Sequence, residues 1–142
     1  MKNLLALVFL FCSFSMFSQI ENIVGSWKTI DDATGEAKSV VRIYKETNGK
    51  YYGVVEQLFR NPDNTCEKCT GENKGKPILG LVIITDMNEK NGNLDGGRIL
   101  DPESGKTYHA SLSIDKKTGK LKVRGSLDKM GIAGRNQFWV KL

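Results

Sequence analysis

The chain has 142 residues, of which 39% are hydrophobic, and a formal net charge of +5 at pH 7. This length suits one domain that buries a core of its own. The basic residues are scattered among acidic ones and form no stripe interleaved with aromatic residues, so composition and charge argue against a nucleic-acid-binding protein.

The N-terminus has the layout of a secretory signal peptide. One positive residue precedes an apolar run at residues 4–11, and small residues follow it. This run is too short to span a bilayer comfortably. We therefore expect removal of residues 1–18, with cleavage after Ser15 or Ser18, and a periplasmic or secreted mature domain of residues 19–142 with no integral membrane span. An N-terminal anchor that stays attached is the alternative.

Beyond the signal peptide, short apolar–polar stretches alternate with Gly, Asn-Gly and Asp-Pro turns, and no convincing helix is found. About eight strands are expected, at residues 25–30, 37–44, 51–58, 78–84, 93–100, 107–114, 120–125 and 134–140. Because short turns join successive strands, neighbours in sequence should also be neighbours in space. Closing the sheet protects both of its edges, so we predict a single all-β domain, an antiparallel up-and-down β-barrel.

Some stretches carry more specific expectations. The strand at 78–84 is the most apolar and should be covered on both faces. Gly96-Gly97 predicts a β-bulge or a close approach of another backbone. The segments at 71–77 and 86–92 depart from the phosphate-binding and calcium-binding patterns that they resemble, so both are interpreted as solvated loops.

Two cysteines lie beyond the signal peptide, Cys66 and Cys69, within a long polar segment at 59–77. In an oxidising compartment the default is a disulfide, which would staple this loop. A redox-active pair would need a helix N-terminus to lower a thiolate pKa, and the preceding residues indicate a loop instead. One such pair is only half of a zinc site, so no metal site is predicted. Free thiols are the remaining alternative.

The densest polar cluster surrounds the turn after residues 93–100. Arg98, Asp101, Tyr108 and His109 are candidates to meet at one end of the barrel beside a bound anion, and the first three are candidate ligand-binding residues. The alternative is turn chemistry, because Asp before Pro initiates a turn, and this explains every position except Arg98. His109 lies on the polar face of its strand and is interpreted as a solvated surface residue.

The last strand leaves two orientations open. Phe138 and Val140 share one face, and Arg135, Gln137 and Trp139 share the other. If the first pair fills the barrel, Trp139 lies outside. If the interior holds a polar-lined ligand site, the second set faces it, which makes Arg135 and Trp139 candidate ligand-binding residues.

No catalytic constellation is identified. His109 would have to serve any Ser-His-Asp triad, and no nucleophile elbow occurs in the sequence. The acidic residues lie mostly in turns, so no pair is favoured for glycoside hydrolysis. No catalytic residue, cofactor or metal ligand is therefore predicted.

Both ends of the predicted barrel carry a recognisable motif. Gly25-Ser26-Trp27 opens the first strand, and Arg135 lies near the start of the last. A Gly-x-Trp early in the chain with a late Arg resembles the lipocalin-like (calycin) pattern. The resemblance implies structural roles for Gly25, Trp27 and Arg135, with Trp27 closing one barrel end and Arg135 packing across it.

Further short motifs follow one another along the mature chain, each present once. They are Asp32 with Gly35, Tyr52-Gly53, Cys66-Glu67-Lys68-Cys69, Pro77-Ile78-Leu79-Gly80-Leu81, Gly96-Gly97-Arg98-Ile99-Leu100-Asp101-Pro102, Gly105-Lys106-Thr107-Tyr108, Val123-Arg124-Gly125 and Gly134-Arg135-Asn136-Gln137. In order and spacing they resemble a bacterial family named only as domain of unknown function 2147. The resemblance implies a small exported protein and assigns no activity.

Three functions are compatible with these residues. The first is an exported calycin-like barrel that binds a small apolar or amphipathic ligand. The second is an envelope structural or interaction protein with a filled barrel and no ligand. An enzyme ranks last, because no convergent nucleophile, base and oxyanion donors are named. The oligomeric state stays open.

Overall fold

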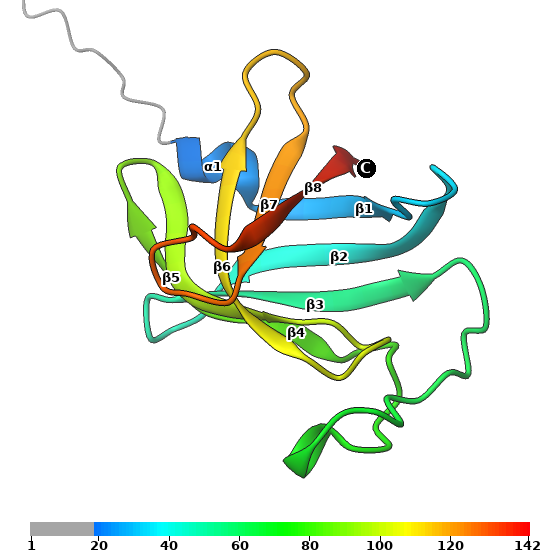
Figure 1. Ribbon diagram of the computed structural model, residues 1–142. Helices are drawn as coiled ribbons and strands as arrows, with labels where there is room; N and C mark the ends of the chain where they lie inside the picture. Colours follow the sequence, from blue (N-terminus) through cyan, green and yellow to red (C-terminus); the bar gives the residue numbers. More distant parts are fainter. Residues whose placement is uncertain (1–18) are drawn as a thin grey trace, which may run out of the picture.

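The computed structural model describes residues 19–142, and the predicted signal peptide lies outside the described residues. Eight antiparallel strands close into a barrel in sequence order, which confirms the predicted all-β up-and-down architecture (Figure 1). The strands are β1 (Gly25–Ile30), β2 (Ala37–Lys45), β3 (Tyr51–Leu58), β4 (Val82–Lys90), β5 (Asn93–Leu100), β6 (Thr107–Ile114), β7 (Leu121–Ser126) and β8 (Gly134–Lys141). The barrel closes by pairing among these eight strands, so residues 19–142 contain a whole barrel with its buried core cluster.

Period-2 alternation in the sequence determines which side chains fill the barrel. Ala110 and Leu112 of β6 are buried, and the serines between and beyond them are only partly covered. Leu112 pairs with Leu94 of β5 and Val123 of β7, both buried, so one face of three neighbouring strands forms a continuous apolar wall. Burying each such side chain contributes roughly 1.5–3 kcal/mol, which fixes the strand register.

One end of the barrel is covered by a short helix, α1 (Gln19–Ile23), that the sequence did not predict. Its Ile20 and Ile23 are buried, and it contacts β5 and β6. The carbonyl oxygen of Ile23 accepts a hydrogen bond from Trp27 Nε1 at 2.8 Å. A five-residue helix is too short to show a helical period, and it is stabilised here by packing onto the barrel. Within the described residues, no helix is long and apolar enough to cross a membrane.

Strand β4 is displaced from the predicted 78–84 to Val82–Lys90, and the interpretation of 86–92 as a solvated loop is wrong for most of its length. The residues before β4 turn instead, because Gly80 has φ +87° and Leu81 N–H donates to the Ile78 carbonyl at 3.0 Å. The predicted burial of both faces of the strand is confirmed at Ile83 and Ile84. These successive residues point to opposite faces and are 7% and 0% exposed.

The Gly96-Gly97 prediction is confirmed in both of its forms. The β5–β6 register shifts between Leu94 and Gly97, as a bulge requires. A Cβ at Gly97 would overlap the Thr85 carbonyl oxygen and Met87 Sδ, so another backbone and a core side chain approach closely. The missing side chain at this position is what allows Met87 to fill the interior.

Three connections use the same six-residue turn, Asp-x-x-(Thr/Ser)-Gly-x, at 31–36, 101–106 and 115–120. In each, the Gly N–H donates to the Asp carbonyl at 2.8 Å and the Gly has φ between +71° and +73°. The Asp carboxylate accepts the N–H two residues on, at 2.8, 3.0 and 3.3 Å. Hydrogen bonds of this kind lower the pKa of Asp31, chiefly from Ala33 N–H, and of Asp115, chiefly from the Thr118 hydroxyl.

Candidate functional site

In an up-and-down barrel, alternate connections lie at opposite ends. The connections 31–36, 59–81, 101–106 and 127–133 therefore surround the end away from α1, and we call this end the mouth. The longest of them, 59–81, projects well clear of the strands (Figure 1). It contains the 3₁₀ turn η1 (Gly71–Asn73).

One wall of the mouth is polar. Thr29 and Ser39 lie two residues along from the paired, buried Trp27 and Val41, so they share the inward face, and their hydroxyl oxygens are 2.7 Å apart. On β8, Gln137 Nε2 donates to Asp32 Oδ2 at 3.3 Å. This wall is built from β1, β2 and β8.

Asp32 also bridges the weakest seam of the barrel. Strands β1 and β8 share two residue pairs, whereas β7 and β8 share six. Nearer the mouth, two side chains of β8 donate to Asp32 Oδ2 across this seam. They are Arg135, through Nη2 at 3.2 Å, and Gln137, through Nε2. The Arg135 side chain is 82% exposed, so this ion pair stabilises the seam only weakly and leaves the guanidinium accessible.

The opposite wall is apolar. Ile99 of β5 pairs with Tyr108 of β6, and both are half-buried. A Cβ at Gly125 of β7 would lie 3.5 Å from Tyr108 Cβ and 3.7 Å from Ile99 Cγ2, so all three positions face the same space. Gly125 also pairs with Arg135, which joins the apolar wall to the polar one. The mouth is therefore amphipathic.

Trp139 lies deeper in the barrel, on the same face of β8 as Gln137. Its indole is 2% exposed, and Nε1 donates to Gln137 Oε1 at 3.2 Å. Of the two orientations that the sequence left open for β8, the structure has the one in which Arg135, Gln137 and Trp139 face inward. Phe138 and Val140 face outward and are 42% and 36% exposed.

The expected packing of Arg135 across Trp27 is wrong. Trp27 pairs with Lys141, whose Nζ lies 4.7 Å from the centroid of the indole ring and donates to the Val24 carbonyl at 3.4 Å. Arg135 lies at the other end of β8, against Asp32. Trp27 is 1% exposed and packs at the end covered by α1, and Lys141 takes the place assigned to the arginine.

The cluster proposed around residue 101 does not converge. Arg98 pairs with His109 on the outward face of β5 and β6, whereas Tyr108 faces the mouth. The Asp101 carboxylate is used by its own turn, where it accepts from Glu103 N–H at 3.0 Å and the Ser104 hydroxyl at 2.8 Å. The alternative of turn chemistry thus describes Asp101.

The predicted disulfide is confirmed between Cys66 and Cys69, whose Cα atoms are 5.3 Å apart. Both cysteines are buried in the core cluster, and Cys66 Sγ lies 3.5 Å from the Pro102 carbonyl oxygen. The segment that the disulfide closes, within the long 59–81 loop, therefore packs against the 101–106 turn at the mouth. Within the described residues, no three His, Cys, Asp or Glu side chains gather to hold a metal ion.

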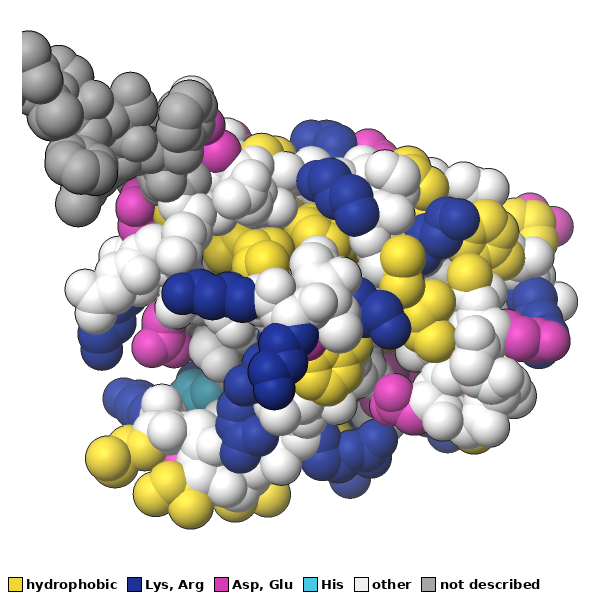
Figure 2. All heavy atoms as spheres, turned by 90° about the horizontal axis from the view of Figure 1, so that it is seen from above, with side chains coloured by type: hydrophobic (Ala, Val, Ile, Leu, Met, Phe, Trp, Pro, Cys, Tyr) yellow, Lys and Arg dark blue, Asp and Glu magenta, His cyan; other side chains and the backbone are white. Residues whose placement is uncertain are grey.

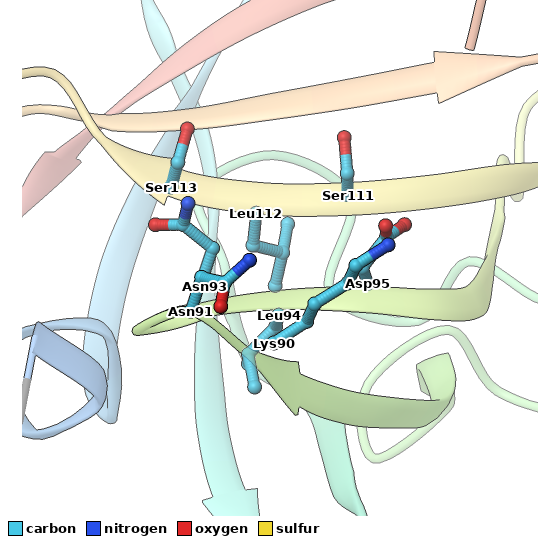
Figure 3. Close-up of a pocket in the computed structure, with 8 residues that line it drawn as sticks. All are labelled: Lys90, Asn91, Asn93, Leu94, Asp95, Ser111, Leu112 and Ser113. Carbon is cyan, nitrogen blue, oxygen red and sulfur yellow. The ribbon is translucent and has the colours of Figure 1, made fainter. Parts of the chain in front are cut away.

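Two pockets of the described residues are lined by other side chains than those of the mouth walls. A pocket of about 260 Å³ opens over β5 and β6, where the register shifts (Figure 3). Its lining residues are Lys90, Asn91, Asn93, Leu94, Asp95, Ser111, Leu112 and Ser113. A second, of about 250 Å³, lies beside the 59–81 loop. Strand alternation gave no signal for either pocket.

The β7–β8 connection at 127–133 is a structured rim of the mouth. The Asp128 carboxylate accepts from Ala133 N–H at 2.7 Å and Ile132 N–H at 3.0 Å. Arg124 donates to the Gly131 carbonyl through Nε at 2.8 Å and through Nη2 at 2.5 Å. These bonds fix the loop without burying its tip.

This loop should loosen in acid. The N–H groups of Ile132 and then Ala133 lower the pKa of Asp128 below its ordinary 3.8. The stabilisation is therefore complete above pH 3.8 and is lost as pH falls through the lowered pKa. In NMR titrations the amide shifts of Ile132 and Ala133 should change with a midpoint below 3.8, and Asp128→Asn should abolish the transition. A midpoint at or above 3.8 would contradict this account.

Comparisons with known proteins agree with the fold. A solved structure of protein HP1028 from Helicobacter pylori, described as a member of the lipocalin family, superposes with a TM-score of 0.73. The two sequences are 22% identical, and the match covers 84% of this chain and 82% of that chain. No curated protein matches. Residues 25–141 match the family model described as an uncharacterized protein conserved in bacteria, DUF2147, and the chain therefore belongs to that family.

Proposed function

We propose that this protein is an exported binding protein that holds a small amphipathic ligand at the barrel mouth. The observation that carries the proposal is the pairing of an apolar wall, Ile99 and Tyr108, with a polar wall that ends in Arg135. Barrels of eight strands are wide enough to hold one small ligand, and the lipocalin-like fold is compatible with that role.

The arrangement favours a ligand with an apolar body and an anionic or hydrogen-bonding head. The bare backbone of Gly125 lies between Tyr108 and Arg135, and a Cβ there would make ordinary contacts with Tyr108 and Ile99 of the apolar wall. A carboxylate at the rim would compete with Asp32 for the exposed Arg135 guanidinium, at little cost in an ion pair that solvent already screens. We retain Tyr108, Arg135 and Trp139 as proposed ligand-binding residues, and we exclude Arg98, which faces outward, and Asp101, whose carboxylate is bonded within its own turn.

Filling the mouth should abolish binding. In Gly125→Phe the added Cβ meets only ordinary contacts, and we expect the ring to cover the surface between the two walls. With the amphipathic dye 1-anilinonaphthalene-8-sulfonate, we expect this variant to bind at least about tenfold more weakly than the parent chain begun at Gln19. Gly125→Ala is the matched control and should retain binding. Equal affinity in all three proteins would rule out the mouth.

Native mass spectrometry of protein purified from its own envelope fraction tests export and cargo together. The mature mass should correspond to cleavage after Ser15 or Ser18, and an added mass released on denaturation would identify the ligand. An uncleaved N-terminus would contradict export.

A filled barrel without ligand is the second candidate, and a specific observation favours it. Met87 occupies the space left by Gly97, and the Ile84 side chain packs against Gly53. Side chains of β4 thus occupy the interior at both positions. A bare protein mass, together with a dye affinity unchanged by Gly125→Phe, would support an envelope interaction protein instead.

A further inference from the structure

Two Asn-Gly pairs form hairpin turns, and their hydrogen bonding differs. Asn48-Gly49 lies between β2 and β3, and Asn91-Gly92 joins β4 to β5. Asparagine followed by glycine is prone to deamidation, because glycine has no side chain to shield its backbone nitrogen from the amide carbon of the asparagine. Both asparagines are exposed, so their local contacts are what set the two pairs apart.

The amide of Asn48 is held through both of its polar atoms. Nδ2 donates to the Tyr52 hydroxyl at 2.8 Å, and Oδ1 accepts from Lys50 N–H at 2.9 Å. The backbone nitrogen that would attack this amide is held as well, because Gly49 N–H donates to the Glu46 carbonyl at 3.0 Å. Deamidation requires the amide to turn and the nitrogen to lose its proton, so these hydrogen bonds have to break first.

The pair Asn91-Gly92 lacks these restraints. Within residues 19–142, neither the side-chain amide of Asn91 nor the Gly92 N–H has a hydrogen-bond partner. Asn91 has φ +53° and Gly92 has φ +81°, as a two-residue type I′ turn requires. This conformation is strained for any residue that has a Cβ, so the turn loses little when Asn91 leaves it to react.

We propose that Asn91 is a site of spontaneous deamidation and that Asn48 is protected from it. The Gly92 nitrogen forms a bond to Asn91 Cγ, the Cγ–Nδ2 bond breaks, and ammonia leaves with the proton of the Gly92 N–H. Water then opens the cyclic imide. Attack of water at Cγ gives aspartate, and attack at the backbone carbonyl carbon gives isoaspartate. The two steps exchange ammonia for water and change no oxidation state.

The modification would alter charge and backbone beside α1. A Cβ at Gly92 would lie 3.2 Å from Gln19 Cβ, so the turn borders this helix. Figure 2 looks onto this end of the barrel and shows Lys and Arg side chains spread over it. Positive charge nearby favours the deprotonated nitrogen that attacks. Isoaspartate also adds a methylene to the backbone between Lys90 and Asn93, which pair across the turn, so it disturbs their register.

Peptide mapping by mass spectrometry tests the proposal on the purified chain of residues 19–142. The folded protein is kept in mildly alkaline buffer, and the replacement of –NH₂ by –OH is followed over time in the peptides that contain Asn91 and Asn48. We expect Asn91 to react about tenfold faster than Asn48 or more, because the hydrogen bonds at Asn48 must break first. Tyr52→Phe, which removes one of these bonds, should speed the reaction at Asn48 and leave Asn91 unchanged.

Unfolding supplies the matched control. In urea both asparagines are free of the fold, so their rates should become similar. Equal rates in the folded protein, or a faster reaction at Asn48, would overturn the proposal. A rate difference that persists in urea would overturn it as well, since the neighbouring sequence would then be its cause. The mouth lies at the other end of the barrel, so dye binding should be the same before and after the incubation and tests the proposed function separately.

Discussion

Trp27→Ala is expected to lower the free energy of unfolding by about 3–5 kcal/mol, the range for truncating a buried aromatic side chain. The indole is 1% exposed and packs in the core cluster at the end of the barrel that α1 covers. It also holds α1 through the hydrogen bond to the Ile23 carbonyl and lies under Lys141 Nζ. Its removal leaves a cavity, an unpaired carbonyl and a helix without its anchor.

Two controls separate these contributions. Trp27→Phe keeps an aromatic ring and loses the hydrogen bond, so we expect a smaller loss of about 1–2 kcal/mol. Phe138→Ala removes an aromatic side chain that is 42% exposed on the outer face, and should cost about 1 kcal/mol. Urea unfolding with an unchanged m-value measures all three. Similar losses at Trp27 and Phe138 would show that the barrel end is not a core.

The fold was predictable because alternation and turns are local. In β6, side chains two residues apart share a face, so the buried Ala110 and Leu112 were visible in the sequence. The Gly96-Gly97 pair inside a strand pattern predicted the bulge that the β5–β6 register shows. The helix α1 was missed because five residues carry no period, and the start of β4 was misplaced because Gly80 turns an apolar run.

The candidate site was harder to predict, because its partners are distant in sequence. Asp32 meets Arg135 and Gln137 across the β1–β8 seam, and only closure of the barrel brings them together. Conversely, Arg98 and Tyr108 are close in sequence but lie on opposite faces of the sheet. Proximity along the chain suggested a cluster that the pleat of the strands separates.

Gly105→Ala should release the disulfide loop from the mouth. A Cβ at this position would overlap the carbonyl group of Lys68, which lies between the two cysteines. Gly35 and Gly119 occupy the same place in the same turn, with φ of +73° and +71°, and a Cβ there meets nothing within 4 Å. Alanine at these controls should cost only the left-handed backbone, about 1–2 kcal/mol. At Gly105 we expect about 1–3 kcal/mol more, from the overlap.

The disulfide determines how much of that extra cost appears. With Cys66 and Cys69 joined, the Lys68 carbonyl is held in a tight ring and cannot move away from the new methyl group. In a Cys66→Ser/Cys69→Ser background the loop is free to shift, so the difference between Gly105→Ala and Gly35→Ala should shrink. Chemical unfolding of the four combinations gives this coupling as a double-mutant cycle. A difference that persists unchanged without the disulfide would mean that the turn, and not the stapled loop, bears the overlap.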